Sequence, residues 1–99
     1  MGIFSAKKVI TQDTVLSRKP NLLFNVIDDE VVMLSIENSE YYGMEKVGSR
    51  IWELLEKPLS FGELVEYLMD EYDITKEKCI EDSVSFLEDL VEKKLIETK

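Results

Sequence analysis

The amino-acid sequence predicts an α+β fold in which a three-stranded antiparallel sheet is followed by three helices. Between residues 22 and 44, apolar segments rich in β-branched residues alternate with short polar turns, which is typical of strands. From residue 45 onward, apolar residues recur at intervals of three and four, which indicates amphipathic helices. With 99 residues, of which 44% are hydrophobic and 33% charged, the chain fits one globular domain with a modest core.

The first two strands are expected at residues 22–27 and 31–36. The polar trio Asp28-Asp29-Glu30 between them suits a hairpin turn, so the two strands should pair in antiparallel fashion. Residues 1–21 mix polar side chains with short apolar pieces and are assigned to a partly ordered N-terminal arm, which leaves residues 22–97 as the domain. Side chains alternate along a strand, and one face must lie on the helices. In the second strand, one face carries Val32, Leu34 and Ile36, and the other carries Val31, Met33 and Ser35.

A third, shorter strand is predicted at residues 41–44, with the sequence Tyr-Tyr-Gly-Met. Its length limits it to an edge of the sheet. The outer N–H and C=O groups of an edge strand lack partners, so an extended peptide can pair with them as one more strand. The segment therefore indicates a peptide-docking edge. Gly43 has two open interpretations, a close backbone approach or bulge on the one hand and a plain turn on the other.

The first two helices are expected at residues 45–56 and from Ser60 to about Tyr72. Trp52 falls on the inner, apolar side of the first helix, where core packing is favoured over ligand contact. Pro58 blocks any continuation of that helix. Ser60 and Glu63 have the spacing of a capping box, which predicts the start of the second helix.

Helix three is expected to be the longest, from a cap at Thr75 to about Lys94. Its apolar residues span a wider stripe than a surface helix needs to close its own core. The surplus flank has two open interpretations: it packs against helix two or the arm, or it lines a groove against the tyrosine strand. The predicted core stripe contains Ile80, Val84, Leu87 and Val91, and the flank contains Cys79, Ser83, Phe86 and Leu90.

The composition argues against several classes of function. A net charge of −9 repels phosphate backbones, so nucleic acid is a poor partner. The sequence has no histidine and a single cysteine, which removes the usual metal ligand and the commonest general base and excludes an internal disulfide. No phosphate loop, nucleophile motif or membrane-spanning run is found. We therefore expect a cytoplasmic protein without a cofactor and without enzymatic activity of its own.

Three segments carry a resemblance to a known family: residues 41–55 (YYGMEKVGSRIWELL), 59–65 (LSFGELV) and 86–96 (FLEDLVEKKLI). Together with the order of strands and helices, they resemble the winged-helix-like PqqD family, also called RiPP recognition elements, over residues 22–97. Among its members, the chain is most similar to the stand-alone leader-binding proteins of lasso-peptide biosynthesis.

The resemblance implies that a precursor's leader peptide lies antiparallel on residues 41–44, with its side chains entering the gap to helix three. It also implies two partner enzymes, a cysteine protease that removes the leader and an ATP-dependent cyclase. PqqD itself serves a radical enzyme, so the family does not fix the product. The candidate peptide-binding residues are Tyr41, Tyr42, Gly43 and Met44 on the strand, of which Tyr42 is expected to face the core, and Cys79, Ser83, Phe86 and Leu90 on helix three.

Two alternatives stay open at this point. A winged-helix DNA-binding regulator would need several basic residues on its recognition helix. Residues 75–91 instead carry two lysines against five acidic residues, which argues against DNA. A structural partner that stabilises a larger enzyme without touching the substrate is only weakly separated from a leader-binding protein by sequence.

Overall fold

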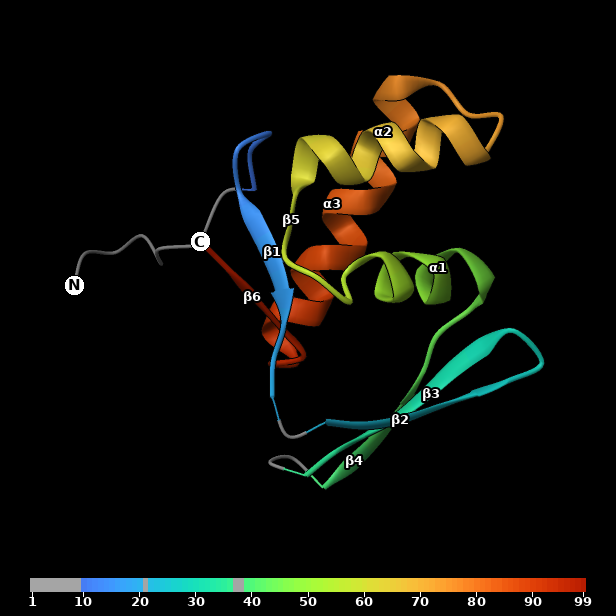
Figure 1. Ribbon diagram of the computed structural model, residues 1–99, viewed down its shortest axis with the longest axis vertical. Coiled ribbons are helices and arrows are strands. Elements are labelled where there is room, and N and C mark those ends of the chain that lie inside the picture. The colour runs from blue at the N-terminus through green and yellow to red at the C-terminus, as the bar shows by residue number, and fades with distance from the viewer. Residues whose placement is uncertain (1–9, 21, 37–38) are drawn as a thin grey trace.

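The structure is a computed structural model that describes residues 10–20, 22–36 and 39–99. It confirms the predicted α+β fold, with a three-stranded antiparallel sheet followed by three helices, and adds a second small sheet (Figure 1). In chain order the elements are β1 (Val15–Arg18), β2 (Leu22–Ile27), β3 (Glu30–Ser35), β4 (Glu40–Gly43), α1 (Lys46–Leu54), β5 (Leu59–Ser60), α2 (Phe61–Glu71), α3 (Lys76–Glu92) and β6 (Ile96–Thr98).

The predicted hairpin and edge strand form an antiparallel sheet with the order β2-β3-β4. The turn between β2 and β3 is tighter than the trio expected from sequence, because Glu30 already belongs to β3. Its two central residues, Asp28 and Asp29, have φ angles of 52° and 66°. Positive φ at both positions is the conformation whose twist matches that of hairpin strands, and aspartate tolerates it better than most residues.

One face of this sheet lies on the helices, as the alternation of side chains predicts. Val31, Met33 and Ser35 are each at most 2% exposed, and the helices all lie on one side of the sheet in Figure 1. On the same inner face, the Phe24 ring meets the Trp52 ring of α1 edge-on, with 5.8 Å between the ring centroids. Trp52 therefore packs in the core, as predicted, and its contact with Phe24 joins α1 to the sheet.

The second sheet has the order β5-β1-β6 and was not predicted from sequence. Residues 15–18, which sequence analysis placed in an N-terminal arm, form its central strand β1. Leu16 pairs with Leu59 on one side and with Thr98 on the other, and its side chain is completely buried. The three strands are two to four residues long, so none of them has a recognisable period of its own.

Arg18 connects β1 to α1 and to the other sheet. Its guanidinium lies 4.6 Å from the centre of the Trp52 ring and 5.0 Å from that of Phe24. Nε donates to the Trp52 carbonyl oxygen at 3.0 Å, and Nη2 donates to the same oxygen. Partial burial lowers the pKa of Arg18, against the opposing effect of Glu56 and Glu53. The side chain thus stabilises the junction by stacking and by hydrogen bonding.

The helix starts follow the sequence signals. Ser60 Oγ accepts from the Glu63 N–H at 3.2 Å, and Glu63 Oε1 accepts from the Ser60 N–H at 3.1 Å, so the capping box of α2 is confirmed. Thr75 Oγ1 accepts from the Lys78 N–H at 3.3 Å at the start of α3. None of the helices in the described ranges is long and apolar enough to span a membrane.

The orientation of α3 differs from the prediction. Three of the four side chains expected to form its flank are buried together with Leu87, namely Cys79, Ser83 and Leu90. The fourth, Phe86, is only partly buried, and so are Ile80, Val84 and Val91 of the predicted core stripe. The reason is that α3 packs between α2 and β6, and β6 was not foreseen. The core face of α3 is therefore formed by Cys79, Ser83, Leu87 and Leu90.

Candidate functional site

Strand β4 is an edge of the β2-β3-β4 sheet. It pairs antiparallel with β3 over Glu40 to Gly43, and within the described residues no strand pairs with its other side. In an antiparallel ladder, the N–H and C=O of one residue point to the same side, and successive residues alternate. The Met44 N–H donates to the Val31 carbonyl at 2.8 Å, toward β3. By alternation Tyr42 also points toward β3, and the backbone groups of Tyr41 and Gly43 point outward.

Gly43 is placed beside open space. A Cβ built on it meets no atom within 4 Å, and its φ is not positive. Neither a tight turn nor a crowded backbone therefore requires glycine here. What the position contributes is its outward backbone groups at the end of β4, where another chain can approach.

A buried hydroxyl fixes the junction between β4 and α1. Ser49 is 3% exposed, and its Oγ accepts from the Val31 N–H at 2.8 Å and donates to the Met44 carbonyl oxygen at 3.0 Å. The side chain of Met44 is 6% exposed and belongs to the core. Buried backbone groups need such partners, so Ser49 holds the end of the open strand in a defined position.

Phe86 of α3 packs against the backbone of α1 at Gly48. A Cβ built on Gly48 would lie 2.8 Å from Phe86 Cζ and 3.0 Å from Cε1, which is too close for any real contact. Glycine in a helix interior is unfavourable by about 1 kcal/mol relative to alanine, so its presence here needs a reason. The reason is the space that the Phe86 ring occupies.

Two cavities meet around Phe86, and both are lined by Val47, Gly48 and Phe86. The first, of about 620 Å³, opens beside Gly43 and Met44 at the end of β4. The second, of about 500 Å³, reaches between α1, α2 and α3 and is lined mainly by apolar atoms. Its further lining residues include Ile51, Leu68, Ile74, Cys79 and Ser83. Together they form a path that begins at the open strand, beside Glu30, Glu45 and Lys46, and becomes mainly apolar between the helices.

The other end of β4 is polar. The Lys93 ammonium lies 5.4 Å from the centre of the Tyr42 ring and 2.7 Å from Asp89 Oδ2. The hydrogen bond to Asp89 is the main cause that raises the pKa of Lys93, so this group stays charged at neutral pH. Tyr42 thus lies on the inner face of the sheet, as predicted. The space between β4 and α3 has an apolar end at Phe86 and a charged end at Lys93.

The structure brings together five of the eight predicted site residues and separates three. Tyr41 is 76% exposed and lies on the opposite face of the sheet from α3, because it pairs with Leu34 of that face. Leu90 is 3% exposed and packs in the core without lining either cavity. Tyr42 lies beside Lys93 at the polar end. The residues grouped around the two cavities are Gly43, Met44, Cys79, Ser83 and Phe86.

Sequence analysis overlooked several residues that shape this site. Val47, Gly48 and Ile74 line the cavities. Ser49 holds the end of β4 by a hydrogen bond, and the Lys93 ammonium lies close to the Tyr42 ring. Only Gly48 had a signal of its own, since glycine within an amphipathic helix suggests a packing reason. The others depend on which segments meet in space.

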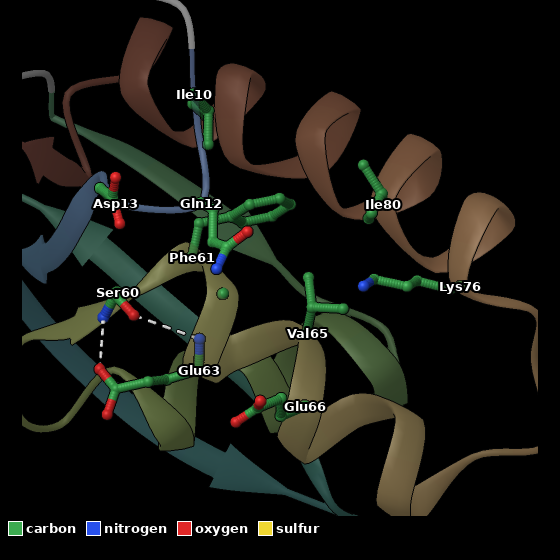
Figure 2. A pocket seen from close by; sticks show the side chains of 11 residues that line it. Ile10, Gln12, Asp13, Ser60, Phe61, Glu63, Val65, Glu66, Lys76 and Ile80 are labelled. Atoms are coloured by element: carbon green, nitrogen blue, oxygen red, sulfur yellow. Dashed lines mark hydrogen bonds between the residues drawn. The ribbon is translucent and has the colours of Figure 1, made fainter.

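Another cavity, of about 370 Å³, lies at the start of α2 (Figure 2). Some of its polar groups are hydrogen-bonded to one another. Ser60 and Glu63 form the capping box, and the Gly62 N–H donates to the Gln12 carbonyl oxygen at 3.0 Å. The start of α2 is far from β4 in Figure 1, so this cavity does not extend the strand edge.

Among the described residues, no group of three or more His, Cys, Asp or Glu side chains could hold a metal ion. Cys79 is a free but buried thiol, 4.0 Å from the Ser83 hydroxyl, which is the usual placement of a small apolar filler.

Known proteins share this fold and part of the sequence. Residues 30–96 match the family described as coenzyme PQQ synthesis protein D (PqqD). The solved structure of TbiB1 in complex with the TbiA(beta) leader peptide has a TM-score of 0.77 and 36% identity, and covers 82% of this chain and 94% of that one. A lasso peptide synthetase B1 complexed with the leader peptide shares the fold, with a TM-score of 0.73, 18% identity and coverage of 83% and 96%. No curated protein sequence matches the chain.

Proposed function

Because this chain belongs to the PqqD family, we propose that it is a non-catalytic recognition protein that binds the leader peptide of a ribosomally made precursor. The leader adds to β4 as a further antiparallel strand. The observation that carries this proposal is the open edge of β4, which has outward backbone groups at Tyr41 and Gly43 and whose Gly43 end lies next to the cavities around Phe86. The relative TbiB1 was solved with a leader peptide, which supports a precursor's leader as the ligand. The resemblance carried by residues 41–55, 59–65 and 86–96 favours a lasso-peptide precursor as its source.

Backbone pairing alone does not select one peptide. Each backbone hydrogen bond contributes about 0.5–1.5 kcal/mol net, and it is nearly independent of sequence. Selection therefore depends on side chains that enter pockets. The mainly apolar lining between α1, α2 and α3 suits an aliphatic or aromatic side chain of the leader.

Strand direction sets which part of the leader meets which pocket. β4 runs from Glu40 toward Gly43, so an antiparallel leader brings its N-terminal part to the cavities beside Phe86. Its C-terminal part then lies at the polar end, near Tyr42 and Lys93. We expect an apolar anchor residue N-terminal to the strand-paired segment, and the precursor's core to leave the protein beyond the Glu40 end of β4.

The binding experiment uses a fluorescently labelled leader peptide and fluorescence anisotropy. We expect micromolar or tighter binding by the wild-type protein. A proline placed in the strand-paired segment removes a donor and should weaken binding. Phe86→Ala opens the apolar path and should weaken it by about tenfold, or about 1.4 kcal/mol.

Tyr67→Ala serves as the control, because Tyr67 is similarly aromatic but lies exposed on α2 and lines neither cavity. Affinity that is indifferent both to the proline and to Phe86→Ala would overturn the proposed site. A leader that binds only a partner enzyme, and not this chain, would overturn the function and favour a purely structural role.

The proposed partners of the complex are a cysteine protease that removes the leader and an ATP-dependent cyclase. Precursor cleavage by the protease should be faster when this protein is present, and the gain should disappear with the proline-containing leader. The proposed compartment is the cytoplasm, where a precursor meets its processing enzymes after translation and where a single reduced cysteine is ordinary.

A further inference from the structure

Three residues at the open edge share the inner face of the sheet, the face that points toward α3. Tyr42 pairs with the buried Met33, and Glu40 pairs with the buried Ser35, so both belong to that face. Met44, two residues further along, is 6% exposed and lies in the core. Side chains that stand directly opposite each other on paired strands point to the same side of the sheet. A leader strand on β4 therefore brings one inner side chain beside each of these three residues in turn.

The three positions differ in chemistry. Met44 lines the cavity that opens beside Phe86. The Lys93 ammonium lies 5.4 Å from the centre of the Tyr42 ring. Glu40 is exposed and carries a carboxylate. Because an antiparallel leader runs from Met44 toward Glu40, its three inner side chains meet a cavity, a cation and an anion in that order.

Lys93 can accept a new carboxylate partner at little cost. Its present partner Asp89 lies one helical turn back, at 2.7 Å, and the two side chains are 41% and 51% exposed. Exposed ion pairs of this kind contribute little to stability. The hydrogen bond to Asp89 chiefly raises the pKa of Lys93, against the opposing effect of partial burial, and Tyr42 and Glu92 add to the rise. An ammonium has three donors, so a leader carboxylate can share it with Asp89 or replace Asp89.

The neighbouring positions disfavour a carboxylate. Two residues toward the N-terminus of the leader, the cavity beside Met44 is lined by Glu30 and Glu45 and by one cation, Lys46. Two residues toward its C-terminus, a carboxylate would stand directly opposite Glu40, and like charges at directly opposite positions are destabilising. Backbone pairing alone lets a leader slip by two residues without turning any side chain to the other face. A negative charge on the leader is therefore accepted in one register only.

We propose that Lys93 sets the register of the bound leader by pairing with the carboxylate of an Asp or Glu residue that stands opposite Tyr42. The inference rests on the proposed leader binding and adds to it the chemical class of one leader residue. Together with the cavity beside Met44, it predicts a leader segment of the form apolar residue, any residue, acidic residue. A leader with the same residues at another spacing pairs with β4 but loses one of the two contacts.

The test is a charge scan of the labelled leader peptide. Each residue of its strand-paired segment is replaced in turn by Asp and by Lys, and affinities are measured by fluorescence anisotropy. At one position we expect the Asp peptide to bind about fivefold more tightly than the Lys peptide, which is the effect of about 1 kcal/mol. At the other positions the protein should favour Lys or make no distinction, because its net charge is −9.

Lys93→Glu should reverse the preference at that one position, so that the Lys peptide binds more tightly than the Asp peptide, and should leave the order elsewhere unchanged. Lys76→Glu is the matched control, because it makes the same charge change at the other end of α3. The helix has 17 residues, which at 1.5 Å each place Lys76 about 25 Å from Lys93. Lys76 lines the separate cavity at the start of α2 (Figure 2). Its variant should keep the wild-type preference within twofold.

Asp89→Asn separates recognition from a merely structural role of the ion pair. Removal of the competing carboxylate should tighten binding of the Asp peptide by about twofold or more and leave the Lys peptide unchanged. If the pair only stabilises α3, Asp89→Asn and Lys93→Glu should instead weaken all peptides alike, which would overturn the proposal. This variant also decides the question if Lys93→Glu does not fold, as judged by circular dichroism.

The same series keeps the two proposals apart. If the wild-type protein binds none of the peptides, the proposed function fails, and the role of Lys93 fails with it. If it binds them without a position that prefers Asp, or if Lys93→Glu leaves that preference in place, the role of Lys93 is overturned and leader binding stands.

Discussion

The two sheets of this protein have opposite relations to solvent. In β5-β1-β6 the strands are two to four residues long, yet Leu16, Ile96 and Thr98 are all at most 8% exposed. In β2-β3-β4 two of the strands are six residues long, yet Leu23, Phe24, Val26 and Ile27 of β2 are 47–59% exposed. Strand length and regularity therefore do not indicate where the stability lies. The strands of the short sheet are buried in the core. The long sheet exposes the edge strand β4 and much of β2 to solvent.

The largest expected difference is between two leucines that are seven residues apart. Leu16→Ala removes a completely buried side chain from β1 and should lower the free energy of unfolding by about 2–5 kcal/mol. Leu23→Ala, the same change at an exposed position of β2, should alter it by less than about 0.5 kcal/mol. Urea unfolding followed by circular dichroism measures both. Equal losses would contradict the comparison.

A smaller loss of stability is expected where the long sheet is anchored. Ser49→Ala leaves the buried Val31 N–H and Met44 carbonyl without the hydroxyl that joins them, which should lower the free energy of unfolding by about 1–3 kcal/mol. Because Ser49 fixes the end of β4, leader affinity should fall as well. Ser49→Thr, which keeps a hydroxyl, is the partner variant, and recovery of leader affinity by threonine would separate the hydrogen bonds from general packing.

Substitutions of two glycines compare the contribution of the cavities around Phe86 with that of the open edge of β4. Gly48→Ala pushes its Cβ into Phe86, at 2.8 Å, and the displaced ring should weaken leader binding by about tenfold. The better helix propensity of alanine, about 1 kcal/mol, partly offsets the strain, so stability should change less than binding. Gly43→Ala meets open space and should change affinity by no more than about twofold. The reverse order of effects would mean that the strand end, and not the Phe86 cavity, controls recognition.

The smallest effect is expected in the helical layer. Arg50 Nε and Nη2 hold both carboxylate oxygens of Glu71 at 2.8 Å, and this hydrogen bonding lowers the pKa of Glu71. The pair's stabilisation is therefore fully present above the ordinary carboxyl pKa of about 4.5 and is lost as pH falls through the depressed value. Both side chains are about one-third exposed, so the contribution is about 0–1 kcal/mol. Glu71→Gln should remove this part of the acid sensitivity in urea titrations at pH 7 and pH 3, and a larger loss than that of Ser49→Ala would contradict the ranking.

Much of the fold could be predicted from the sequence because its signals are local. The period-two alternation and the Asp28-Asp29 turn act within a few residues, and they specified β2 and β3. The Ser60 and Glu63 capping pair and Thr75 likewise located α2 and α3. The candidate site was predictable only in part. The edge position of β4 follows from its length, and Phe86 belongs to the apolar surplus of α3.

What only the tertiary structure decided are the contacts between segments far apart in the chain. β1 pairs with β5 and β6 about 40 and 80 residues away, and the gain from such pairing is invisible in a four-residue segment. Leu90 is buried because β6 packs against α3. The Phe86 ring packs where it does because α3 lies close to α1 at Gly48. By itself the sequence determined β2, β3, β4 and the three helices, because hydrogen bonding and capping act between near neighbours. Burial, and with it the division between the core, the cavities around Phe86 and the exposed sheet edge, depends on which distant surfaces meet.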